Sequence, residues 1–348
     1  MRAWAGDVGG LRGTAEPLAT AYDVALLDLD GVIYVGAEAV PHAAQSLATA
    51  RELGQRSAFV TNNALRTPDV VAGQLRDLGV PAEAVDVVTS AQAAASVLSA
   101  RLPVGSRVLL VGGEGLRVAL HDRGLVPVSS ADDDPVAVVT GHDPQMTWAR
   151  LAEAALALGR GATWIASNTD ANIPSRRGRL PGAGSVVALL STATGRCPDE
   201  VAGKPHPALH RESVERTGAR RPLVVGDRLD TDIEGAHAGG AASLLVLTGV
   251  TDPGDLLAAP PRQRPTHVAA DLRGLLMRHP WPDINAAASD GAAASDGAAA
   301  SVGTAHASRD GQRLLVAGED ALDRLRAACV LAWGAADAGR PCTEVSGL

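Results

Sequence analysis

Between residues 22 and 275, short apolar runs alternate with longer stretches in which apolar residues recur at helical spacing. The longer stretches predict helices, for example at 43–53 and 148–158. The apolar runs predict strands at 24–29, 57–61, 108–111, 136–140, 164–166, 223–226 and 243–247. Some runs contain no polar position, which is typical of strands buried on both faces. The alternation therefore predicts an α/β fold in which helices cover a parallel sheet.

The pattern changes after about residue 277. AAASDG occurs twice in tandem between 285 and 301 and is followed by AAAS, a composition that favours a flexible linker, although the alanine runs could form helix. Beyond it, 313–316 predicts a strand, and Leu322, Leu325, Cys329 and Ala332 share one apolar helix face. So short a C-terminal region cannot bury much core alone, so we expect it to dock on the main body or on a partner.

Composition narrows the class of protein. The net charge is −8, which argues against nucleic acid or an anionic membrane as the main partner. The sequence contains no apolar run long enough to span a bilayer, and its first residues lack the apolar region of a secretory signal. Three scattered cysteines do not suggest a disulfide framework or a zinc site. We therefore expect a soluble cytoplasmic protein without a membrane partner.

The basic residues are almost all arginine. Lys204 is the one lysine among 31 basic residues. This can reflect an arginine-biased composition, or a place that requires a compact ammonium where a planar guanidinium would not fit. Lys204 lies in AGKPHP, where a glycine and two prolines restrict the backbone.

Polar residues also follow two predicted strands in the first half of the chain. In ALLDLDGV, Asp28 and Asp30 could serve as nucleophile and proton donor, or could simply end a solvated loop. In FVTNNA, a hydroxyl and two amides could hold phosphate oxygens, or could form an ordinary strand-to-helix turn. These three residues are Thr61, Asn62 and Asn63.

A further acidic segment, LVVGDRLDTDI, follows the predicted strand at 223–226. Asp227, Asp230 and Asp232 would repel one another unless a cation or hydrogen-bond donors relieve them. Oxygen ligands at a strand end suit a hard ion such as Mg²⁺. Asp230 or Thr231 could instead cap the start of a helix.

The order of these four segments resembles the four motifs of the haloacid dehalogenase (HAD) phosphohydrolase superfamily. The residues inserted between the second and third motifs look like the α/β cap of its subfamily IIA, which includes 4-nitrophenyl phosphatases and phosphoglycolate phosphatases. The resemblance covers about residues 22–275. It implies a Rossmann-like core with a parallel sheet, an inserted C2-type cap, and a small C-terminal α+β extension. The expected limits are a segment at 1–21, core at 22–87 and 183–278, cap at 88–182, linker at 279–303 and extension at 304–348.

The resemblance also implies catalytic and metal-binding roles. Asp28 would be the nucleophile that forms an aspartyl-phosphate, and Asp30 would protonate the leaving alcohol and then deprotonate the attacking water. A Mg²⁺ ion would be bound by Asp28, by the backbone carbonyl of Asp30 and by Asp227, with Asp232 behind these ligands.

Other residues are implied to bind the substrate. Thr61, Asn62, Asn63 and Lys204 would hold the phosphoryl oxygens. The cap loop SNTDANIP would lie over the active site, so Asn168 and Asp170 are candidates for contact with the leaving group; they could equally be turn residues that cap the strand at 164–166.

The expected substrate is a small phosphate monoester. A cap restricts access, and the cap region has few aromatic side chains to stack on a nucleobase or pyridoxal ring. The alanine- and arginine-rich composition and the C-terminal extension resemble actinobacterial glycerol 3-phosphate phosphatases, which makes glycerol 3-phosphate the expected substrate. Phosphoglycolate, pyridoxal phosphate and nucleoside monophosphates are alternatives, as are a phosphotransferase and a regulated scaffold with a binding tail. The resemblance also suggests a homodimer formed through the cap.

Overall fold

The computed structural model describes residues 10–175, 177–284 and 298–348. The chain divides into two compact units, one formed by Met1–Ser57 with Ala219–Leu348 and the other by Ala58–Gly218. The expected N-terminal segment and linker lie partly outside the described residues, and the expected core and cap limits stay a prediction. Within the described ranges, no helix combines the length and apolarity required to cross a bilayer.

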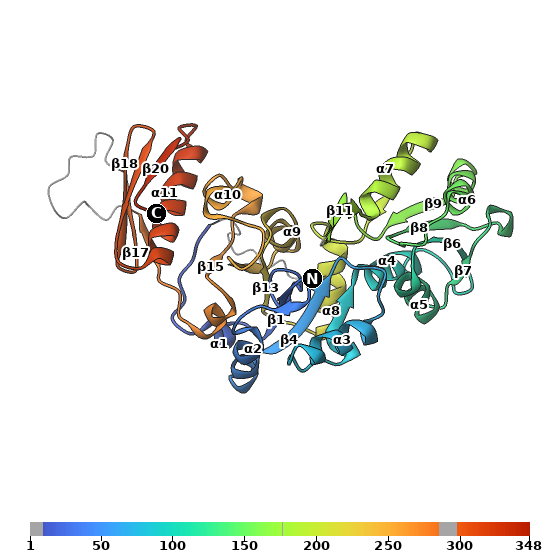
Figure 1. The fold of residues 1–348 in the computed structure, drawn as a ribbon, viewed down its shortest axis with the longest axis horizontal. Coiled ribbons are helices and arrows are strands. Elements are labelled where there is room, and N and C mark those ends of the chain that lie inside the picture. The colour runs from blue at the N-terminus through green and yellow to red at the C-terminus, as the bar shows by residue number, and fades with distance from the viewer. Residues whose placement is uncertain (1–9, 176, 285–297) are drawn as a thin grey trace. The chain divides into compact units, whose positions relative to one another are not determined.

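The first unit contains four parallel strands in the order β15-β14-β13-β1. They are β1 Val24–Leu27, β13 Pro222–Gly226, β14 Ala242–Val246 and β15 His267–Ala269. Strand β1 thus pairs with β13, which lies far along the chain (Figure 1). In β13 and β14 every residue after the first is buried. Burial on both faces explains why these strands contain so few polar residues.

Short helices and turns precede, connect and follow these strands. They are α1 Leu18–Ala21, α2 Ala43–Glu52, a π-turn Leu229–Ile233, α9 Glu234–Gly239, α10 Pro253–Leu257, and 3₁₀ turns Pro261–Gln263 and Leu272–Leu276. A small hairpin, β2 Tyr34–Val35 with β3 Glu38–Ala39, follows the first motif. Helix α10 begins where Pro253 fixes its first turn and Asp252 accepts a hydrogen bond from the backbone N–H of Asp255 at 2.8 Å.

A second sheet in this unit is built from the C-terminal residues. Its strands are β16 Pro282–Ile284, β17 Ala299–Val302, β18 Ala305–Asp310, β19 Arg313–Ala317 and β20 Glu344–Ser346, in that order. Burial alternates along β18 and β19, because α11, Ala321–Asp337, packs against one face of the sheet (Figure 1). The first strand of this sheet begins at Pro282, and the expected start of the extension at residue 304 stays a prediction.

Helix α11 also packs against the parallel-sheet part of the same unit. Leu325, Cys329 and Trp333 join a buried cluster with Leu245 and Val268. Three polar contacts reinforce this packing: the Trp333 indole donates to the Leu256 carbonyl at 3.0 Å, Arg264 pairs with Asp337 at 2.6 and 2.8 Å, and Arg326 donates to the Val268 carbonyl at 2.6 Å. The structure thus confirms that the tail docks on the main body and that Cys329 is a core residue.

The second unit contains a parallel sheet of five strands in the order β12-β9-β8-β6-β7. They are β6 Arg107–Val111, β7 Val126–Val128, β8 Ala137–Thr140, β9 Thr163–Ala166 and β12 Glu200–Val201. A hairpin of β10 Asn172–Ser175 and β11 Gly178–Pro181 follows β9. The helices around this sheet are α5 Glu114–Asp122, α6 Trp148–Gly159 and α7 Ala183–Thr194.

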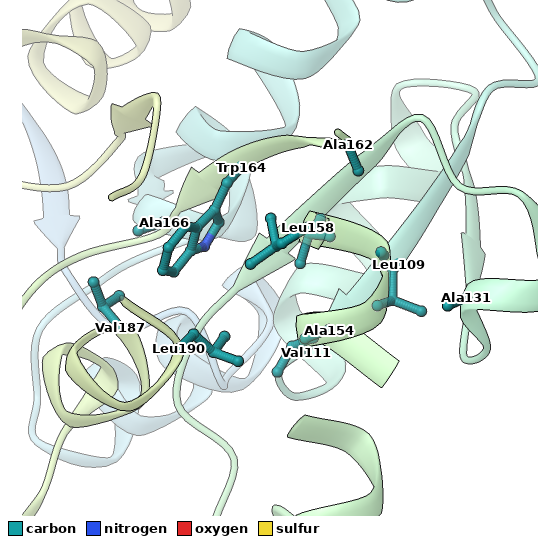
Figure 2. Packing of buried hydrophobic residues seen from close by; sticks show 12 residues of the cluster. Leu109, Val111, Ala131, Ala154, Leu158, Ala162, Trp164, Ala166, Val187 and Leu190 are labelled. Atoms are coloured by element: carbon teal, nitrogen blue, oxygen red, sulfur yellow. The ribbon is translucent and has the colours of Figure 1, made fainter. Parts of the chain in front are cut away.

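The core of this sheet is built around Trp164. Its ring is fully buried near Leu158 of α6 and Val187 and Leu190 of α7 (Figure 2). The indole N–H donates to the Thr140 hydroxyl at 3.1 Å, so the one polar atom of the ring is satisfied. The apolar face of α7 packs on this five-stranded sheet, through Val187 and Leu190. The helical spacing of apolar residues does not by itself tell which sheet a helix covers.

The remaining elements of the second unit carry further residues that the sequence predicts for the site. Strand β4, Arg56–Thr61, starts in the first unit and continues into the second, where it pairs in parallel with β5, Val87–Thr89. Between them lie α3 Pro68–Asp77 and a 3₁₀ turn Ala84–Asp86, and α4 Ser90–Ser99 follows β5. A 3₁₀ turn Ala131–Asp133 precedes β8, and α8 Pro207–Thr217 ends the unit at Gly218.

Candidate functional site

Three aspartates of the first unit meet at the carboxyl ends of neighbouring strands. Asp28 directly follows β1, and its backbone N–H donates to the Val225 carbonyl of β13 at 2.8 Å. Asp227 follows β13, and Asp232 lies in the π-turn that comes next. Each of the three can offer an oxygen within 4.8 Å of the others. Parallel pairing of β1 with β13 therefore brings together acids that lie far apart in the sequence.

Asp227 is held by backbone from two loops. Its Oδ2 accepts a hydrogen bond from the Val250 N–H at 2.7 Å, and its carbonyl accepts from the Thr251 N–H at 3.2 Å. A Cβ at Gly31 or Gly249 would collide with the Asp227 carboxylate. Gly31 also has φ of 81°, a conformation that side chains rarely adopt. Because these two residues are glycines, there is room for the Asp227 carboxylate between them.

The other two acids of the GDRLDTDI segment behave differently from each other. Asp232 is 1% exposed, and its Oδ2 accepts from the Arg228 N–H at 3.2 Å. Asp230 is exposed and pairs with the Arg228 guanidinium at 2.8 and 3.0 Å. Asp232 therefore lies in the cluster with Asp28 and Asp227, and its expected place behind the metal ligands stays a prediction. Asp230 forms a surface ion pair and does not cap a helix.

The donor set fits a hard divalent cation. Three carboxylates, two of them buried, lie close enough to share one ion. Their mutual repulsion is strong away from water, and a cation between them would relieve it. Carboxylate oxygens are the ligands that Mg²⁺ takes in proteins. Asp28, Asp227 and Asp232 are thus the described residues that could hold Mg²⁺.

Asp30 lies outside this cluster of carboxylates. It is exposed and forms a β-bridge with Tyr34, at the turn where the Gly31 N–H donates to the Tyr34 carbonyl at 2.8 Å. The Thr248 hydroxyl donates to the Gly31 carbonyl at 2.5 Å and ties this turn to the loop after β14. An exposed carboxyl at a fixed turn can exchange protons with bound molecules or with water.

In the second unit, Thr61 and Asn63 occupy the turn at the end of β4. Thr61 is 6% exposed, and its hydroxyl accepts from the Asn63 N–H at 3.1 Å. The Asn63 side chain accepts from the backbone N–H groups of Leu65 at 2.9 Å and Arg66 at 3.2 Å. Asn63 therefore serves the strand-to-helix turn, one of the two readings that its sequence position allowed.

Lys204 is buried beside the same turn. Its residue exposure is 8%, its Nζ lies 3.3 Å from the Val60 carbonyl, and its backbone N–H donates to Asn62 Oδ1 at 2.8 Å. Burying an ammonium is costly unless nearby acceptors or anions compensate. The one lysine of the sequence is thus a buried residue whose ammonium lies beside the end of β4.

The loop after β9 reaches the same residues. Asn168 is 5% exposed, and its side-chain Nδ2 donates to the backbone carbonyl of Asn62 at 2.7 Å. Its side-chain Oδ1 accepts from the Asp170 N–H at 3.1 Å. The Asp170 carboxylate accepts from Asn62 Nδ2 at 3.2 Å. Sequence reasoning did not single out Ser90, which also contacts Asn62, because it stands in no recognisable polar segment. Gly203 of AGKPHP contacts Asn62 as well, and the sequence pattern did not indicate this contact.

Comparison with known proteins identifies the class. A model described as haloacid dehalogenase-like hydrolase matches residues 25–126, and a related HAD-hydrolase-like model matches 201–275. The chain is 51% identical over 260 residues to D-glycerol 3-phosphate phosphatase of Mycobacterium tuberculosis, covering 75% of this chain and 72% of that protein. It is 38% identical over 232 residues to acid sugar phosphatase of Staphylococcus aureus, covering 66% of this chain and 88% of that protein.

Solved structures agree with this grouping. A crystal structure of glycerol phosphate phosphatase from Mycobacterium tuberculosis in complex with magnesium matches with a TM-score of 0.83 and 43% identity, covering 96% of each chain. A 4-nitrophenylphosphatase from Thermotoga maritima matches with a TM-score of 0.69 and 34% identity, covering 74% of this chain and 98% of that one.

The chain belongs to the haloacid dehalogenase-like hydrolase family. This confirms the resemblance seen in its motifs and the expected α/β fold class. The named relatives are phosphatases, in agreement with the expected enzyme class, a phosphoric monoester hydrolase.

Proposed function

We propose that this chain is a Mg²⁺-dependent phosphatase that hydrolyses small phosphate monoesters, with glycerol 3-phosphate as its substrate. The observation that carries the proposal is the cluster of Asp28, Asp227 and Asp232 at the ends of β1 and β13. The 51% identity to a D-glycerol 3-phosphate phosphatase supports the substrate, and the related structure with magnesium supports the metal.

In the proposed reaction, Asp28 is the nucleophile. Its carboxylate forms a bond to phosphorus as the bond from phosphorus to the leaving oxygen breaks, which gives an aspartyl-phosphate. Asp30 gives its proton to the leaving alcohol, and then accepts a proton from the water that cleaves the intermediate. Inorganic phosphate leaves, and both carboxyl groups return to their starting states. The exposed position of Asp30 supports a group that transfers protons twice per cycle.

Positive charge must balance the phosphoryl oxygens. We assign Lys204 and the Thr61 hydroxyl to these oxygens, since the transferred group carries negative charge throughout the reaction. A Mg²⁺ ion held by Asp28 and Asp227 would supply further neutralisation of the phosphoryl group. Asp232, in the same cluster, would keep the ligands in place.

The burial of Trp164 in the second unit supports a polyol phosphate as the substrate. Of the two tryptophans between residues 88 and 182, Trp164 is enclosed in the hydrophobic core and Trp148 is 76% exposed on α6. Trp164 is therefore not available to stack on a nucleobase or pyridoxal ring. A dimer formed through the cap and a cytoplasmic location stay predictions.

A substrate panel tests the proposal. Phosphate release is measured with Mg²⁺, and with a chelator as control, from glycerol 3-phosphate, phosphoglycolate, pyridoxal phosphate, nucleoside monophosphates and 4-nitrophenyl phosphate. We expect kcat/KM for glycerol 3-phosphate to exceed the others about tenfold or more, about 1.4 kcal/mol of transition-state preference. A preference for another ester would reject the substrate, and no release from any ester would reject the activity.

A further inference from the structure

Asn62 lies where three segments of the second unit converge. It follows β4, and it contacts both the loop 167–170 and the loop 203–204. A Cβ at Gly203 would lie 2.6 Å from Asn62 Oδ1 and 2.7 Å from the Ser167 carbonyl oxygen. Only glycine permits so close an approach, so the three segments are packed against one another at this point.

The side-chain amide of Asn62 is engaged at both ends. Its Oδ1 accepts from the Lys204 backbone N–H at 2.8 Å, while its Nδ2 donates to the Lys204 carbonyl at 3.1 Å. The same Nδ2 donates to the Asp170 carboxylate at 3.2 Å. An amide nitrogen has two hydrogens, and these two partners use both. Both Nδ2 hydrogens of Asn62 are thus used by protein groups, and a phosphoryl oxygen would need the same hydrogens.

The backbone carbonyl of Asn62 is held equally firmly. It accepts from Asn168 Nδ2 at 2.7 Å and from the Ser90 hydroxyl at 2.6 Å. Asn168 and Ser90 are both buried, at 5% and 0% exposure. Hydrogen bonds of this kind are stronger away from water, and losing one partner leaves a buried polar group unsatisfied.

We propose that Asn62, Asn168 and Asp170 form a latch that fixes the backbone of Lys204, and that all three are positioning residues. Neither Asn62 nor Asp170 then contacts the phosphoryl group or the leaving group through its side chain. Pairing both backbone groups of Lys204 with one amide fixes the direction in which its side chain leaves the loop. This inference rests on the proposed phosphatase activity, in which Lys204 holds the phosphoryl oxygens.

The latch predicts strongly coupled mutations. Small displacements of a group that binds the reacting atoms reduce rates about 100-fold. We expect Asn62→Ala to lower kcat/KM about 100-fold and Asp170→Ala about tenfold, because each loosens Lys204. The double variant should resemble Asn62→Ala alone, since the contact is already broken. A double variant whose loss equals the product of the two single losses would overturn the latch.

Two further readouts separate positioning from direct contact. Asp170→Asn keeps an acceptor oxygen for Asn62, so it should restore most of the activity lost in Asp170→Ala. Asp170→Ala should lower kcat/KM by the same factor for glycerol 3-phosphate and for 4-nitrophenyl phosphate. A loss confined to glycerol 3-phosphate, or an Asp170→Asn variant as impaired as Asp170→Ala, would assign Asp170 to the leaving group instead.

Controls keep the inference distinct from the proposed function. Asp143→Asn changes another carboxylate of this unit, one that pairs with Arg150 at 2.6 Å, and should leave turnover unchanged. If Asn62→Ala does not fold, as thermal melting would show, Asn62→Asp keeps the size and Oδ1 but replaces both donors, and the same cycle applies. An inactive wild-type enzyme would reject the phosphatase activity, whereas an active one with additive variants would reject only the latch.

Discussion

The Asp227 carboxylate depends on two loops that are distant from it in the sequence. The Val250 N–H donates to it at 2.7 Å. Gly31 and Gly249 lie so close to the carboxylate that a Cβ on either residue would collide with it. A buried carboxylate needs such donors, because they replace the water that it has lost. The space around Asp227 is therefore set by backbone as much as by side chains.

Gly249→Ala adds one methyl group and tests whether the backbone at this position sets the space around Asp227. The added Cβ would collide with the carboxylate, so we expect Asp227 to shift and Mg²⁺ affinity, measured by calorimetric titration, to fall about tenfold or more. The matched control is Gly334→Ala in α11, where a Cβ would have no heavy atom within 4 Å. Equal Mg²⁺ affinity in wild type and Gly249→Ala would contradict the argument.

The polar residues of the candidate site could be predicted from the sequence, but their surroundings could not. Asp28, Asp227 and Lys204 stand in short segments whose order is specific to the family. By contrast, the donor from Val250 reaches Asp227, and the donor from Ser90 reaches Asn62, only because strands and loops are folded together within each unit. A backbone donor leaves no signal in residue type, since any residue except proline supplies an N–H. A single buried serine forms no pattern in the sequence.

At the scale of elements, α11 joins two apolar surfaces of the first unit. One side covers the C-terminal sheet, and the other contributes Leu325, Cys329 and Trp333 to the cluster with the parallel strands. Burial raises the pKa of the Cys329 thiol, so this cysteine stays protonated and unreactive at neutral pH. The helix therefore links the tail to the body through packing.

Trp333→Ala should weaken this link. The ring is 3% exposed, it donates to the Leu256 carbonyl, and the Arg264 guanidinium lies 5.5 Å from its centroid. We expect a loss of about 3–5 kcal/mol in the free energy of unfolding of the first unit, measured in urea. Trp148→Ala, which removes a tryptophan that is 76% exposed, should change it by less than about 0.5 kcal/mol. Similar losses in the two variants would refute this account of α11.

Uninterrupted apolar runs could be predicted as strands, and strands that lack such a run could not. The predicted runs at 57–61 and 223–226 correspond closely to β4 and β13. Strands β7, Val126–Val128, and β18, Ala305–Asp310, were missed because one contains Pro127 and the other is built from small and charged residues. Such segments form strands through pairing with their neighbours, which no local pattern records.

At the scale of the whole molecule, two buried histidines and one partly buried histidine make stability depend on pH. His267 and His279 lie with ring centroids 5.0 Å apart in the first unit, and His210 lies in α8 of the second. Burial lowers the pKa of His267 to about 3, and that of His279 and His210 to about 4. All three remain neutral in the folded protein at pH values where the unfolded chain takes up protons.

Stability should therefore fall on acidification. Above the unfolded histidine pKa of about 6.5 these groups have no effect, and as pH decreases from there toward 4 each costs about 1.4 kcal/mol per pH unit. Urea unfolding between pH 7.5 and 4.5 measures the slope. His279→Gln should reduce this dependence of the unfolding free energy on pH. His306 is exposed on β18, so His306→Gln should not reduce it. Parallel pH profiles for wild type and His279→Gln would show that burial of this ring does not set the slope.

The central claim is that Asp28 attacks phosphorus in a metal-dependent phosphatase. Phosphate release from glycerol 3-phosphate with Mg²⁺, compared between Asp28→Asn and Asp230→Asn, tests it most directly. Both changes replace an acid of a conspicuous motif by its amide, but Asp28 belongs to the carboxylate cluster and Asp230 pairs with Arg228 at the surface. We expect Asp28→Asn to lose at least about 1,000-fold in kcat, since an amide is a poor nucleophile, and Asp230→Asn to keep wild-type turnover. Full activity in Asp28→Asn would contradict the mechanism.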